Sequence, residues 1–187
     1  MPKVLVPLAE GCEEIEAVTI IDLLRRAAID VVVAGLQPGI VKASRGTLLV
    51  PDCTLDVALR ENYDMVVLPG GMPGMTHLRE DPRIISLLQK MARDGKYTCA
   101  ICAAPAVLAE AGLLDGRTAT SYPGFVDSMN LPHTTFSNDA VVKDGKVITS
   151  RGPGTAMDFA LELIEALLGR ARRDEIEAAL QRPGKYC

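Results

Sequence analysis

The sequence predicts an α/β protein whose central sheet is mostly parallel and is covered by helices on both faces. Short apolar runs alternate with helical segments along almost the whole chain. The runs are nearly continuous in apolar residues, which is typical of strands buried on both sides. A chain of 187 residues is long enough to bury most of its unfolded surface in one domain. We therefore expect a single α/β sandwich over residues 1–187.

The expected strands follow from apolar runs bounded by turn residues. Four runs are typical of buried strands, at 3–7, 29–36, 65–69 and 97–101. A hairpin is expected where 41–44 and 47–50 flank Arg45–Gly46. A second is expected within 140–150, because Asp144–Gly145 is a strong hairpin turn.

The expected helices occupy the segments between these strands. Asp81 followed by Pro82 is typical of an N-cap with proline in the first turn, so a helix should run from 82 to about 94. The remaining helices are expected at 13–28, from 103 to about 111, at 155–168 and at 174–180. Residues 182–187 are expected to form a loose tail.

Composition limits the possible partners and location. The net charge of −4 and the pI near 5.2 argue against nucleic acid or an anionic membrane as the main partner. No apolar run approaches the roughly 18 residues of a membrane-spanning helix, and the N-terminus has no signal-peptide pattern. The five cysteines are odd in number and irregularly spaced, which indicates reduced thiols in the cytoplasm. No zinc-binding pattern is present, so no metal is expected.

Cys102 lies where a strand-like run gives way to the small-residue, helix-forming run that begins at Ala103. A cysteine at such a turn has its sulfur near helix amides, which favour the reactive thiolate. The alternative is a buried structural cysteine, because free cysteine is among the most buried residue types. Cys99 and Cys102 also form a C-x-x-C pattern. We discount a redox pair, because Cys99 falls within the strand and points to the other face.

Glu16 is the second unusual residue. Positions 16, 20, 23 and 27 form one stripe of the first helix, and the other three are Ile20, Leu23 and Ala27. A buried carboxyl tends to keep its proton, and a protonated Glu16 could donate a hydrogen bond to a thiolate. The alternative is an ordinary first-turn glutamate that interacts with the helix dipole.

Gly70 and Gly71 end a buried strand and would let backbone amides approach a ligand closely, although a plain tight turn has the same pattern. In a parallel sheet this loop, the loop after Pro7 and the turn at Cys102 meet at the carboxyl edge, where ligands bind. The two histidines, His77 and His133, lie in no catalytic motif, and we expect both at the surface.

Four motifs then occur in a recognisable order and spacing. They are AEGCEEIE at 9–16, VLPGG at 67–71, AICAAP at 100–105 and TSRGPGT at 149–155. With these motifs the chain resembles the ThiJ/PfpI superfamily, specifically its parkinsonism-associated protein deglycase branch and the bacterial YajL-type chaperone/deglycase. The resemblance extends from about residue 3 to residue 169.

The resemblance implies a flavodoxin-like three-layer sandwich, a homodimer and an easily oxidised Cys102 beside a protonated Glu16. It implies that the amides of Gly71 and Ala103 bind an oxyanion or a sulfinate. It also implies that further residues line the pocket or contact an anion, with Arg26 contributed by the partner subunit. These residues are Gly70, Arg45, Arg26, Gly152, Pro153 and Tyr122.

Two departures from the family pattern narrow which type of family member and which activity we expect. Animal members place a histidine before the proline where this chain has Tyr122–Pro123, and bacterial relatives carry an aromatic residue there. Protease-like members follow the cysteine with histidine, whereas this chain has Ala103. A cysteine peptidase with a Cys-His triad is therefore not expected.

Two functions follow from the resemblance and the residues. The first is a cofactor-independent glyoxalase or protein deglycase, in which the Cys102 thiolate and Glu16 act on methylglyoxal-type α-oxoaldehydes or on glycated proteins. The second is a non-enzymatic oxidative-stress sensor or redox-regulated chaperone, in which Cys102 becomes a sulfinate. A class I glutamine amidotransferase is rejected, because it needs a His-x-Glu motif downstream and no histidine follows His133.

Overall fold

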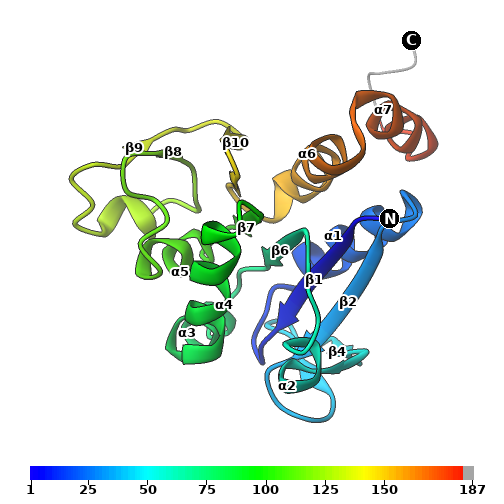
Figure 1. The fold of residues 1–187 in the computed structure, drawn as a ribbon, viewed down its shortest axis with the longest axis horizontal. Coiled ribbons are helices and arrows are strands. Elements are labelled where there is room, and N and C mark those ends of the chain that lie inside the picture. Colours follow the sequence, from blue (N-terminus) through cyan, green and yellow to red (C-terminus); the bar gives the residue numbers. More distant parts are fainter. Residues whose placement is uncertain (183–187) are drawn as a thin grey trace.

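The computed structural model describes residues 1–182 and contains a seven-stranded sheet in the order β10-β11-β7-β6-β1-β2-β5 (Figure 1). All neighbouring strands are parallel except β10, which pairs antiparallel with β11 at one edge. The strands of this sheet are β1 (Lys3–Leu8), β2 (Asp30–Gly35), β5 (Cys53–Thr54), β6 (Met65–Leu68), β7 (Tyr97–Ile101), β10 (Val141–Asp144) and β11 (Val147–Ser150).

Helices cover both faces of the sheet, as the sequence predicted (Figure 1). On one side α1 packs on α6, and α6 packs on α7; on the other, α4 and α5 pack on β7. The helices are α1 (Glu14–Arg26), α2 (Leu55–Ala58), α3 (Gly74–Glu80), α4 (Pro82–Arg93), α5 (Pro105–Glu110), α6 (Ala156–Leu168) and α7 (Arg170–Ala179), with short 3₁₀ turns η1 (Val126–Ser128) and η2 (Pro153–Thr155). The mixed α/β fold with its mostly parallel sheet is therefore confirmed.

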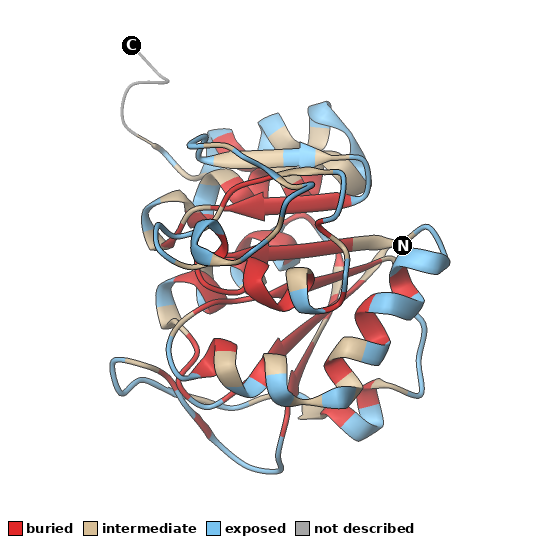
Figure 2. Cartoon of the chain, turned by 90° about the vertical axis from the view of Figure 1, so that its left-hand side faces the viewer, coloured by how far each residue is buried: buried red, intermediate tan, exposed pale blue. Residues whose placement is uncertain are grey.

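The core is centred on the middle strands. The β1 residues Val4, Leu5 and Val6 and the whole of β6 are fully buried, which explains their continuous apolar sequences. Figure 2 shows the same distribution, with buried residues along the strands and exposed residues on the outer faces of the helices. The parallel register places Leu8 at the carboxyl end of β1 opposite Gly35 of β2, so the functional loops emerge from one edge.

Both predicted hairpins form. β3 (Val41–Lys42) pairs antiparallel with β4 (Leu48–Leu49), and β10 pairs with β11. Asp81 also caps α4 as expected, because its Oδ1 accepts a hydrogen bond from the backbone N–H of Arg83 at 2.9 Å.

Three helix predictions need correction. α5 begins at Pro105 and not at 103, because residues 102–104 form the turn out of β7. α7 begins at Arg170, because side chains of its first turn make ion pairs, such as Arg173 with Glu177. α3 was not predicted, since Gly74 at its start and Pro73 just before it are typical of a loop.

Several short elements were also missed, because two-residue strands give no periodic signal. They are β5, α2, β8 (Thr118–Ala119) and β9 (Thr135–Phe136). The loose tail was predicted at residues 182–187, and residues 183–187 lie outside the part of the chain that the structure describes. Within residues 1–182, no helix has the length and apolar character needed to cross a membrane.

Candidate active site

Cys102 occupies a strained turn between β7 and α5. Its φ angle of +64° lies in the left-handed region, which costs a non-glycine residue roughly 1–2 kcal/mol. Two backbone hydrogen bonds hold this conformation. The Cys102 N–H donates to the Ser150 carbonyl at 2.9 Å, and the Tyr122 N–H donates to the Cys102 carbonyl at 2.8 Å. The fold therefore fixes the position of the sulfur, and 8% of the residue remains exposed.

Glu16 is fully buried in the first turn of α1, at the head of the predicted apolar stripe, whose other members are also buried. Its Oε2 accepts a hydrogen bond from the backbone N–H of Gly70 at 2.8 Å. Its Oε1 is buried and makes no hydrogen bond of standard geometry within the described residues. The Cys102 thiol is the side chain that interacts with this carboxyl. The structure thus brings Glu16 and Cys102 together from α1 and the end of β7.

Burial raises the pKa of Glu16 to about 7, and the Gly70 amide and the Cys102 thiol lower it only in part. A carboxyl with a pKa near neutrality can both accept and release a proton under physiological conditions. The choice between an ordinary first-turn glutamate and a buried, proton-holding one is therefore decided in favour of the second.

Burial acts against the thiolate that the sequence analysis expected at Cys102. Burial, and after it the charge of Glu16 and the hydrogen bond between the two side chains, raise the pKa of the Cys102 thiol to about 12. The amides of Gly71 and Ala103 act in the opposite direction, as predicted, but do not outweigh burial. Because the carboxyl and the thiol are in contact, ionisation of Glu16 disfavours ionisation of Cys102.

Gly70 and Gly71 cannot carry a side chain here. A Cβ on Gly70 would lie 2.7 Å from the Cβ of Cys102 and 3.0 Å from the amide nitrogen of Ala103. A Cβ on Gly71, where φ is +90°, would lie 2.4 Å from the amide nitrogen of Glu13. The absent side chains let the loop after β6 fit between Cys102 and the start of α1. Packing therefore requires glycine at both positions, and the binding of an oxyanion by this loop stays a prediction.

A cavity of about 410 Å³ is lined by residues from two loops, including the predicted Tyr122, Gly152 and Pro153. Its connection to Cys102 is through the backbone, because the Tyr122 N–H donates to the Cys102 carbonyl. A Cβ on Gly152 would approach the Tyr122 ring to 3.3 Å, so the ring lies against this loop. Arg151 also lines the cavity, and its Nη1 donates to the Asn138 carbonyl at 2.9 Å. Sequence reasoning missed Arg151, although it stands within the 149–155 motif.

The two predicted anion-contacting arginines are not gathered around Cys102 within one chain. Arg45 is exposed in the β3–β4 turn, and its backbone N–H donates to Glu14, two residues before Glu16. Arg26 is at the other end of α1, ten residues and ~15 Å along the helix from Glu16. There it forms an ion pair with Asp22 at 2.7 Å.

The other cysteines and the histidines are not part of this site. Cys12, Cys53 and Cys99 are free thiols in the described part of the chain, and Cys187 lies outside it. Burial raises the pKa of Cys12 to about 12. His77 and His133 are exposed, as predicted. Among residues 1–182, no group of three or more His, Cys, Asp or Glu side chains is arranged to hold a metal ion.

Comparison with known proteins agrees with this geometry. The profile of the DJ-1/PfpI family matches residues 2–166. The chain belongs to the DJ-1/PfpI family. Protein dj-1beta of Drosophila melanogaster is 43% identical over 177 residues, covering 94% of this chain and 95% of that protein. The solved structure named "Toxoplasma gondii DJ-1, oxidized" is 42% identical with a TM-score of 0.91, covering 96% of this chain and 98% of that one.

Two further DJ-1 relatives bear on function and length. A Caenorhabditis elegans protein named glutathione-independent glyoxalase DJR-1.2 is 36% identical over 167 residues, covering 89% of each chain. DJ-1 homolog B of Arabidopsis thaliana is 43% identical over 180 residues, which are 95% of this chain but 41% of that protein. This chain therefore spans about two fifths of the plant relative. The finer resemblance to YajL-type proteins stays a prediction.

Proposed function

We propose that this protein is a glyoxalase that converts methylglyoxal-type α-oxoaldehydes to 2-hydroxy acids without an added cofactor. The observation that carries the proposal is the buried contact between the Glu16 carboxyl and the Cys102 thiol, with the pKa of Glu16 near 7. The amides of Gly71 and Ala103 face the same sulfur. The name of the Caenorhabditis elegans relative, a glutathione-independent glyoxalase, supports the same chemistry.

Because the pKa of Cys102 is raised, the reaction begins with the protonated thiol of Cys102 and not with a preformed thiolate. The sulfur of Cys102 bonds to the aldehyde carbon while its proton passes to the Glu16 carboxylate. The carbonyl oxygen gains negative charge, which the two amides stabilise until Glu16 returns the proton to it. The product of this step is a hemithioacetal on Cys102.

Glu16 then moves a proton within the bound hemithioacetal. It removes the proton from the former aldehyde carbon and delivers one to the former ketone carbon, while the hydroxyl proton of the first carbon passes to the ketone oxygen. The first carbon is thereby oxidised and the second reduced. The result is a thioester on Cys102. Water cleaves the thioester, releases lactate from methylglyoxal and restores the thiol, so the net reaction consumes only water.

The same residues could act on the early adducts that these aldehydes form on protein amines and thiols, which would make the protein a deglycase. The 8% of Cys102 that remains exposed would give such adducts access to the residue from the surface. Both histidines are exposed and neither is among the groups that shift the pKa of Cys102, which argues against a Cys-His peptidase mechanism.

We also propose a homodimer in the cytoplasm. Ile15 and Val18 are large exposed apolar side chains on α1, and Leu48 and Val50 are exposed on and after β4. A second copy that paired α1 antiparallel with itself would cover apolar surface and bring its own Arg26 towards Glu16. Sedimentation velocity measures this directly: a dimer is expected for the wild type and a monomer for Val18→Asp.

Methylglyoxal turnover tests the enzymatic proposal. The wild type is expected to form lactate, whereas Cys102→Ser and Glu16→Gln lose at least about 100-fold in kcat/KM, because each removes a group from the proton transfer. Cys53→Ser, a half-buried cysteine away from the site, is the matched control and should keep full activity. Undiminished turnover in Cys102→Ser would overturn the proposal.

A second function, sensing of peroxide, is favoured by the relative whose solved structure is named as oxidised. Two equivalents of hydrogen peroxide would convert the Cys102 thiol to a sulfinate and release two waters. A protonated Glu16 could then donate a hydrogen bond to a sulfinate oxygen. If the wild type turns over no methylglyoxal but mass spectrometry finds a sulfinate on Cys102 at low peroxide, this second function replaces the first.

A further inference from the structure

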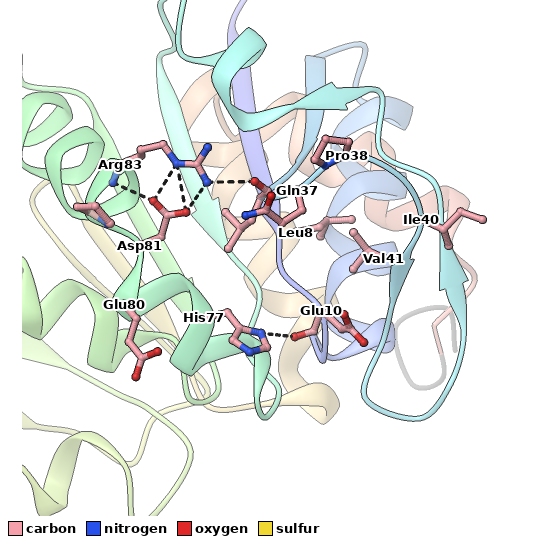
Figure 3. A pocket seen from close by; sticks show the side chains of 12 residues that line it. Leu8, Glu10, Gln37, Pro38, Ile40, Val41, His77, Glu80, Asp81 and Arg83 are labelled. Atoms are coloured by element: carbon pink, nitrogen blue, oxygen red, sulfur yellow. Dashed lines mark hydrogen bonds and ion pairs between the residues drawn. The ribbon is translucent and has the colours of Figure 1, made fainter.

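A cavity of about 620 Å³ lies away from Cys102, at the carboxyl ends of β1 and β2 (Figure 3). Leu8, Leu36 and Val41 give it an apolar floor, and all three are buried in the core. The rim carries Glu10 from the β1–α1 loop and His77 from α3. The volume falls in the range of small-molecule sites, which are mostly apolar with a few polar groups at the edge.

The positive charge of Arg83 in this cavity is already neutralised. Its guanidinium donates to both carboxylate oxygens of Asp81, to Asp56 and to the Leu36 carbonyl. Figure 3 shows the hydrogen bonds between Arg83 and Asp81. An incoming anion would have to compete with two carboxylates for this side chain. Arg83 therefore closes one wall of the cavity and leaves little positive charge for a ligand.

The remaining charged groups of the rim are acidic. The carboxylates of Glu10 and Glu80 form no ion pair within residues 1–182. The ring Nδ1 of His77 lies 2.8 Å from the backbone oxygen of Glu10 (Figure 3). Because a carbonyl oxygen only accepts, Nδ1 carries a proton, and Nε2 of the neutral ring is an acceptor. The rim thus combines negative charge with hydrogen-bond acceptors.

We propose that this cavity binds a small primary ammonium ion that carries an apolar group. The ammonium would lie at the rim beside Glu10, and the apolar group would cover Leu8, Leu36 and Val41. This site is separate from the chemistry at Cys102, because none of the residues that line it is among the groups that shift the pKa of Cys102 or of Glu16. An uncharged analogue would keep the apolar contact and lose the interaction with the carboxylates.

NMR titration of the labelled protein with 2-phenylethylamine tests the proposal at a pH of about 8, where imidazole is neutral. Saturable shift changes are expected at Leu8, Leu36 and Val41. The uncharged 2-phenylethanol and the apolar-free methylamine should each bind at least about fivefold more weakly.

The matched variants separate this site from general surface charge. Glu10→Gln with Glu80→Gln should weaken 2-phenylethylamine about fivefold, because two exposed carboxylates each contribute modestly. Glu110→Gln removes one exposed carboxylate at the end of α5 and should change nothing. The proposal is overturned if no saturation occurs, if the shifts map to another surface, if the alcohol binds as tightly, or if the double variant binds like the wild type.

Discussion

Replacing Glu16 by glutamine should change how the stability of the protein depends on pH. Burial raises the pKa of Glu16 from its ordinary value of 4.5 to about 7. Below pH 4.5 the carboxyl is protonated in both the folded and the unfolded chain. As the pH rises towards 7, the unfolded chain ionises first, so the wild type loses stability relative to Glu16→Gln. Glutamine keeps an oxygen for the Gly70 amide and cannot ionise.

The expected loss follows from the two pKa values. At about 1.4 kcal/mol for each pKa unit, raising the pKa from 4.5 to about 7 corresponds to about 3 kcal/mol. Urea unfolding of both proteins at about pH 4 and about pH 8 measures this difference. Glu110→Gln, on the surface, serves as the control. If the difference between wild type and Glu16→Gln changed by less than about 0.5 kcal/mol between the two pH values, the buried, proton-holding carboxyl would be refuted.

Three further predictions concern the same site and the core. Because Glu16 must be ionised to accept the thiol proton, kcat/KM for methylglyoxal should rise with pH through about 7, and a flat or falling profile would contradict this assignment. Gly71→Ala should destabilise the protein by at least about 2 kcal/mol more than Gly39→Ala in urea unfolding, because both have positive φ but only Gly71 meets backbone atoms. Phe159→Ala should cost about 3–5 kcal/mol by leaving a core cavity, whereas the half-exposed Phe136→Ala should cost less than about 1 kcal/mol.

The main strands, and Glu16 and Cys102 as separate candidates, could be predicted because each leaves a local signal. The contact between these two residues was expected from the family resemblance. A continuous apolar run such as Val4–Val6 is typical of a central strand that is buried on both faces. Glu16 was noticeable because it interrupts a helical stripe that is otherwise apolar. Two glycines after a buried strand indicated the close approach at Gly70, although only the coordinates show that Cys102 is the neighbour.

Other features depend on tertiary contacts that leave no local signal. The pKa of Cys102 results from competition between burial and two amides. Sequence reasoning recognised both burial and the amides, but only the coordinates show which of them has the larger effect. α3 forms although its sequence contains Gly74 and follows Pro73, because the helix packs on α4 and α5. The role of His77 in the rim of the second cavity depends on the Glu10 carbonyl, which is 67 positions away in the sequence.

The most direct test of the central claim is to quench the protein during turnover of methylglyoxal and locate the acyl group by tandem mass spectrometry. The mechanism predicts a lactoyl thioester on Cys102 in the wild type. In Glu16→Gln it predicts that this thioester is strongly reduced, because the proton transfer that forms it lacks its base. Lactate formation without acylation of Cys102, or equal acylation in Glu16→Gln, would contradict the account.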